Sequence, residues 1–154
     1  MNKNHRILGW HFAQDDGCLG YGDGRKIIAG RILSVDCEPR CCQRGLHCSR
    51  SIVDALSYSR GVMLCRVEVW GDVHEIDDNL CGTHRKTIAM ANASTVLHEF
   101  AVWCARRALK LVDDPDPRSV KALRVKSAWL KGKASDEELA AARDDARASW
   151  APSW

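Results

Sequence analysis

Apolar and polar residues alternate along the first two-thirds of the chain at the two-residue period of β-strands. Each alternating stretch is bounded by glycine, aspartate or other turn-forming residues, which is typical of short strands. We predict strands over residues 7–12 (ILGWHF), 31–35 (RILSV), 46–49 (LHCS) and 63–70 (MLCRVEVW). A short helix is expected over residues 52–58, between the last two strands.

Turn signals suggest how these strands are connected. The pair Asp23-Gly24 is typical of a hairpin turn, so the strand at 31–35 is expected to return alongside the first strand. A second turn is predicted after residue 70, followed by a further strand over 73–76. Residues 77–87 are predicted to be irregular.

The period becomes helical near residue 94, where apolar residues recur every three to four positions. This pattern predicts a helix over 94–112. A second helix opens at an Asp-Pro pair and runs over 117–132. A third, over about 136–150, begins at the capping box that Ser135 and Glu138 can form.

Strands therefore dominate the first part of the chain and helices the last part. This order predicts an α+β fold, in which helices pack on a mainly antiparallel sheet. We expect an α+β domain over residues 1–112 and a helical hairpin over 113–154 packed on it.

Composition narrows the class of protein. The net charge of +3 is too small to indicate a nucleic-acid binder by itself. No apolar run approaches the ~20 residues of a membrane span, so we expect a cytoplasmic protein without a membrane partner. In a reducing compartment the eight cysteines are free thiols or metal ligands rather than disulfides.

Two histidines lie on predicted strands, and they can meet in one cleft if those strands pair. Imidazole suits such a cleft because it donates, accepts and changes charge near neutral pH. The alternative is that each ring is half-buried and only ties backbone together. A glycine-rich segment over 17–24 can cradle an anion or form a plain hairpin. The candidate pocket residues are His11, Tyr21, Arg25, His47 and Ser49.

Four cysteines, Cys37, Cys41, Cys42 and Cys48, lie close together in the sequence with His47. A structural zinc site usually draws its thiolates from CxxC-type turns, and these spacings contain none. We therefore predict buried thiols here and no metal site.

Charge is unevenly distributed in the C-terminal third. Between residues 106 and 133 nine basic residues face three acidic ones, whereas residues 135–147 are mainly acidic. This pattern is typical of a salt-bridged helix pair, and also of a docking surface for nucleic acid or an acidic protein. Tryptophans near a terminus fold back or anchor an interface. The candidate partner-binding residues are Arg106, Arg107, Lys110, Lys121, Arg124, Lys126, Trp150 and Trp154.

Strings spread over nearly the whole chain carry a resemblance to a known family: residues 9–11 (GWH), 19–25 (LGYGDGR), 30 (G), 42–49 (CQRGLHCS), 54–56 (DAL), 65–71 (CRVEVWG), 97–101 (LHEFA) and 116–119 (DPRS). They resemble an uncharacterised domain of phage and bacterial proteins, whose specific part is the Cys-x-x-Gly-Leu-His-x-Ser core. The resemblance implies a phage or mobile-element setting. In that setting we expect an accessory protein that binds a host protein or ribonucleoprotein complex, for instance to antagonise a defence system such as CRISPR-Cas.

A more distant likeness is to ADP-ribosyltransferases, which share the order of an early strand with a histidine, a second histidine strand, a helix and a strand. This likeness implies an NAD-using enzyme with His11, Tyr21 and His47 around the nicotinamide or ribose. The acidic Glu-x-Glu strand of those enzymes has no match, since Glu68 lies too early and Glu99 is on a predicted helix. No cofactor is expected unless this alternative holds. Nucleic-acid binding through the basic helices is the third alternative.

Overall fold

The computed structural model describes residues 5–20 and 23–148 of the 154-residue chain. Its contacts divide the chain into two compact units, Met1–Ala93 and Ser94–Trp154, which we call the sheet unit and the helical unit. The helix that begins at Ser94 belongs to the helical unit, whereas the sequence analysis assigned residues 94–112 to the α+β domain.

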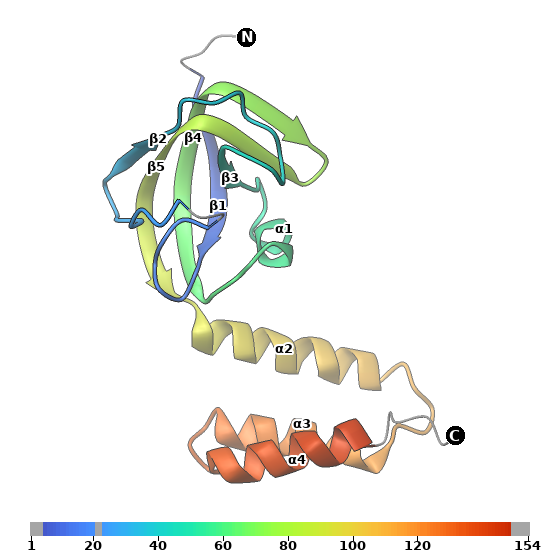
Figure 1. The fold of residues 1–154 in the computed structure, drawn as a ribbon. Coiled ribbons are helices and arrows are strands. Elements are labelled where there is room, and N and C mark those ends of the chain that lie inside the picture. Colours follow the sequence, from blue (N-terminus) through green and yellow to red (C-terminus); the bar gives the residue numbers. More distant parts are fainter. Residues whose placement is uncertain (1–4, 21–22, 149–154) are drawn as a thin grey trace. The chain divides into compact units, whose positions relative to one another are not determined.

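The sheet unit is built on an antiparallel five-stranded sheet (Figure 1). In chain order its elements are β1 (Ile7–Ala13), β2 (Ile32–Ser34), β3 (Leu46–Cys48), α1 (Ile52–Ser57), β4 (Met63–Ile76) and β5 (Asn79–Asn92). The strand order is β1-β4-β5-β2, and β3 pairs with a separate stretch of β5. Because helices follow this sheet in the chain, the predicted α+β class is confirmed.

The sheet curls until the residue after β3 meets β1. Trp10 and Ser49 exchange two backbone hydrogen bonds, with N–O distances of 2.7 and 2.9 Å. A sheet that closes in this way gathers its inward-facing side chains around one interior, where small barrels can hold a ligand. The buried core consists of Ile7, Ala13, Leu19, Ile27, Leu33, Leu46, Cys48, Cys65, Val67, Val69 and Leu80.

β4 continues through Gly71, where the sequence predicted a turn and a separate strand over 73–76. That prediction was wrong because a β-bulge lies at this point. Gly71 has a φ of 91°, and a Cβ on it would overlap the Thr83 hydroxyl. Only glycine fits there, and the bulge bends the strand without ending it.

The segment after β4 is a long strand rather than an irregular region. β5 includes most of residues 77–87, so the prediction of irregular structure was wrong. The chain reverses at Asp77, whose φ of 43° is in the left-handed region that a short polar residue tolerates. β2 pairs with β5 and not with β1, so the hairpin expected between 7–12 and 31–35 was wrong too.

The helical unit contains three described helices (Figure 1). They are α2 (Ser94–Leu109), α3 (Pro117–Trp129) and α4 (Asp136–Ala148). Asp116 caps α3 by accepting the Arg118 amide at 2.7 Å. The predicted capping box is confirmed, because Ser135 N donates to Glu138 Oε2 at 2.7 Å and Glu138 N donates to Ser135 Oγ at 3.2 Å. Within the described part of the chain, no helix has both the length and the apolarity that crossing a bilayer requires.

Candidate functional site

A cavity of about 260 Å³ lies where the sheet closes, between β1, β3 and α1. His11 from β1, His47 from β3 and Ser49 all line it. The structure therefore brings together three residues that the sequence singled out. Arg85 of β5 lines the same cavity, although the sequence analysis did not select it.

Arg85 is a buried cation at the centre of the sheet, with only 1% of its surface exposed. Its Nη1 donates to the carbonyl oxygen of His47 at 2.7 Å. Its Nε and Nη2 have no hydrogen-bond partner among the residues that the structure describes. Burial lowers the pKa of Arg85 to about 10, so the side chain stays charged at neutral pH. The two unpartnered nitrogens form one edge of the guanidinium, and such an edge binds carboxylate or phosphate through two parallel hydrogen bonds.

The two histidines beside Arg85 are neutral near pH 7. Burial lowers the pKa of His11 well below its ordinary value, and the positive charge of Arg85 lowers it further. Burial also lowers the pKa of His47, with Arg85 as the next cause. His47 Nε2 accepts the backbone amide of Cys42 at 3.0 Å, which helps to orient the ring. Neutral imidazoles leave the buried guanidinium without a competing cation next to it.

The glycine-rich segment lines the cavity with Cys18, Leu19, Gly20 and Asp23, whereas Arg25, which follows it, is not part of the lining. Arg25 forms a two-point ion pair with Asp23, at 2.7 Å from Nε to Oδ1 and 2.8 Å from Nη2 to Oδ2. The hydrogen bond from Arg25 lowers the pKa of the Asp23 carboxyl, which is therefore ionised near pH 7. Arg25 also donates to the carbonyl of Ser34, so it holds the loop rather than the cavity. Tyr21 lies outside the described residues.

Arg85 and Tyr58 are among the cavity residues that the sequence analysis did not select. Arg85 lies in a stretch predicted to be irregular, although threonines at 83 and 87 on either side of it are a weak strand signal. Tyr58, which follows α1, lines the cavity and donates its hydroxyl to Asp78 at 2.6 Å. This hydrogen bond raises the pKa of Tyr58 to about 12.

The cysteines of residues 37–48 are divided between different surroundings. Cys48 lies in the core, where burial raises the pKa of its thiol to about 12. Cys41 lies beside His74 of β4 and Cys81 of β5. The sequence analysis connected neither of these with Cys41, because both are far from it along the chain.

The C-terminal basic residues are largely engaged within the helical unit. Arg106 and Lys121 each bond to a polar side chain of the next helix. Arg107 and Lys126 each lie over the ring of a tryptophan in their own helix. The other two basic candidates are exposed: Lys110 and Arg124. Two candidates lie outside the described residues: Trp150 and Trp154.

Comparisons with known proteins provide no relative from which the role of this cavity could be inferred. The resemblances to a phage domain and to ADP-ribosyltransferases stay predictions, and the function has to be inferred from the cavity itself. No protein-family model, curated protein or solved structure matches the chain.

Proposed function

We propose that the sheet unit binds a small molecule through a carboxylate or phosphate group that occupies the cavity beside Arg85. The observation that carries this proposal is the buried edge of the guanidinium, whose Nε and Nη2 lack a partner among the described residues. Buried donors without partners are costly, and charged ones most of all. An oxyanion would satisfy both N–H groups and the charge together.

The neighbouring side chains suit an anionic ligand. His11 and His47 are neutral, so neither adds a charge beside Arg85, and the His11 ring can donate one N–H or accept one proton when an anion binds. Tyr58 and Ser49 add hydroxyls to the lining. The cavity is slightly smaller than the ~300–1,000 Å³ typical of drug-sized ligands. It therefore suits a small anion, or one end of a larger molecule that extends beyond it.

Binding is better supported than ADP-ribosyl transfer. Asp23 is the only carboxylate in the lining that the structure describes, and it is already paired with Arg25. Glu68 forms an ion pair with Arg6 at 2.9 Å. No described acidic side chain of the cavity is thus available to stabilise a cationic sugar. NAD nevertheless belongs among the ligands to be tested, because its pyrophosphate has the required charge.

The biological setting is a separate proposal. A phage or mobile-element accessory protein that binds a host protein or ribonucleoprotein fits the resemblance in the sequence, and capture of one stoichiometric partner from bacterial lysate would support it. Nucleic-acid binding is less well supported, since four of the basic candidates bond or stack inside the helical unit. Binding through phosphates would have to weaken steeply with salt.

Calorimetric titration of the full chain tests the cavity proposal. The probes are inorganic phosphate, acetate, AMP and NAD, with uncharged nicotinamide as the negative control. We expect at least one anion to bind at a single site and Arg85→Met to weaken it about tenfold or more, since a charged hydrogen bond contributes about 1.5–3 kcal/mol. Arg31→Met removes an exposed arginine and should leave binding unchanged. Equal affinity in the wild type and Arg85→Met would refute the assignment.

A further inference from the structure

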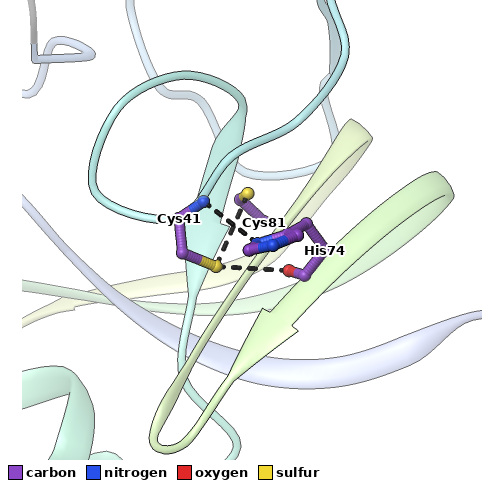
Figure 2. Close-up of side chains that lie close together, drawn as sticks. All are labelled: Cys41, His74 and Cys81. Carbon is purple, nitrogen blue, oxygen red and sulfur yellow. Dashed lines mark hydrogen bonds between the residues drawn. The ribbon is translucent and has the colours of Figure 1, made fainter.

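A second group of reactive side chains lies at the β4–β5 hairpin, outside the cavity lining. Cys41, His74 and Cys81 come from three separate segments of the sheet unit (Figure 2). One ligand atom from each residue, a thiol sulfur or a ring nitrogen, lies within 4.8 Å of the other two. Two thiols and an imidazole are the ligand types that zinc sites use most.

The backbone holds these three side chains together. The β4–β5 register places His74 directly opposite Cys81. Cys41 lies in a tight loop closed by two backbone hydrogen bonds of 2.9 Å between Arg40 and Arg44. The next residue, Cys42, has a φ of 64°, a left-handed conformation that is costly for a residue other than glycine.

Gly45 lets this loop approach β5 closely. Its φ is 110°, and a Cβ there would lie 3.3 Å from both the Cβ and the Sγ of Cys81. The same approach leaves Cys41 Sγ 3.7 Å from Cys81 Sγ. The amide of Cys41 donates to His74 Nδ1 at 3.3 Å, which places the ring beside the thiols (Figure 2). A neutral imidazole has one lone pair, so an ion bound by His74 would take the place of this hydrogen bond.

The spacing of the sulfurs fits a shared metal ion. In a tetrahedral site with Zn–S bonds of about 2.3 Å, two thiolates lie about 3.8 Å apart. The separation of 3.7 Å between the two sulfurs is close to this value. It is far longer than the ~2.05 Å of a disulfide, so the spacing of the two sulfurs matches shared ligation of an ion rather than a direct S–S bond.

The surroundings favour a soft divalent ion over a hard one. The cluster contains no carboxylate, and thiolate with imidazole favours zinc over magnesium or calcium. His74 is exposed, which gives an ion a route from solvent.

We propose that Cys41, His74 and Cys81 bind one zinc ion, which fixes the loop of residues 36–45 to the β4–β5 hairpin. Zinc binds cysteine as the thiolate, so binding releases protons and strengthens as the pH rises. The loop also carries the Cys42 amide that bonds to His47, so the ion would steady one wall of the cavity.

Cobalt substitution tests the site directly. The full chain is purified under reducing conditions, stripped with chelator and titrated with Co²⁺, which reports thiolate ligands by charge-transfer absorption and tetrahedral geometry by intense visible bands. We expect one Co²⁺ per chain with both signatures, and displacement by Zn²⁺. Absence of the charge-transfer band would overturn the proposal, as would a Cys41–Cys81 disulfide that persists under reductant.

Variants separate ligation from folding. Cys41→Ser and Cys81→Ser each replace a buried sulfur, and either should abolish the charge-transfer band or weaken binding at least about tenfold. His74→Ala changes an exposed residue and should leave the fold intact while weakening binding to a similar degree. Cys104→Ser, in the helical unit, is the matched control and should bind as the wild type does. Unchanged binding in His74→Ala and Cys81→Ser would refute the ligand assignment.

Discussion

Replacing Arg85 by methionine should stabilise the folded chain while it weakens anion binding. Methionine keeps much of the length of the side chain and removes the buried charge. Most substitutions at a residue with 1% exposure destabilise a protein. A gain in stability from Arg85→Met would therefore indicate that the guanidinium serves to bind a ligand and not to stabilise the fold.

The magnitude follows from the surroundings of the guanidinium. Two buried N–H groups without described partners cost about 1–3 kcal/mol each, and the lost bond to the His47 carbonyl opposes this by about 1.5–3 kcal/mol. The fall in the pKa of Arg85 from 12.5 to about 10 independently indicates that the charged form is disfavoured by roughly 3 kcal/mol. We therefore expect Arg85→Met to raise the free energy of unfolding by about 1–3 kcal/mol, as when buried charges elsewhere are replaced by apolar residues.

The assay is equilibrium unfolding in urea, in a buffer without phosphate, sulfate or carboxylate. Arg31→Met serves as the control and should change the free energy of unfolding by less than about 0.5 kcal/mol, because that side chain is exposed. Adding a ligand that binds should make the free energy of unfolding of the wild type the larger of the two. A loss of more than about 1 kcal/mol in Arg85→Met would show that the guanidinium is a satisfied structural group, and the reasoning would fail.

Three further predictions concern other parts of the sheet unit. Because the pKa values of His11 and His47 lie below the ordinary 6.5, the unfolded chain binds protons that the native chain excludes. Stability should fall as the pH drops below about 6.5, by up to about 1.4 kcal/mol per pH unit and histidine, and a variant with glutamine at both positions should show a shallower fall in urea unfolding. Gly71→Ala should lower the free energy of unfolding by about 2 kcal/mol or more, because the added Cβ is strained by the positive φ and overlaps the Thr83 hydroxyl. Gly17→Ala is the control, since its φ of 69° imposes strain without overlap, and it should cost about 1 kcal/mol. Equal losses in the two variants would contradict the account of the bulge. Chelator should lower the melting temperature of the zinc-loaded wild type but not of His74→Ala, as scanning calorimetry can show.

The sequence was most informative where side-chain pattern and burial agree. β1 and the first part of β4 alternate apolar residues with polar ones, so strands were predicted at 7–12 and 63–70, close to where β1 and that part of β4 lie. The starts of α3 and α4 were predicted from local capping chemistry at Asp116 and Ser135, which depends on neighbours only. These features need no knowledge of distant contacts.

β5 was missed for a physical reason. Two of its buried positions are occupied by Arg85 and Thr87, and a third, Gly82, has no side chain. A method that recognises strands by alternating apolar residues cannot detect a strand whose inward positions are polar or empty. Missing this strand also meant missing Arg85 as a site residue. An arginine in an irregular loop would be exposed to water, whereas Arg85 is buried at the centre of the sheet.

The cluster of Cys41, His74 and Cys81 could not be predicted from local spacing in the sequence either. Cys41 meets Cys81 and His74 only because the β4–β5 hairpin folds beneath the loop of residues 36–45. Metal-ligand motifs are recognisable in sequence when a single turn supplies two ligands. Here each ligand comes from a different segment, and only the strand register brings them together.

The two backbone bonds between Trp10 and Ser49 bear on how partners can dock. Many recognition domains extend an open sheet by accepting a strand from their target, and unpaired edges also invite aggregation. At this point the outer margin of β1 is already occupied by the chain itself. A binding protein would have to use side chains on loops and helices there, which makes its affinity sensitive to surface substitution rather than to backbone pairing.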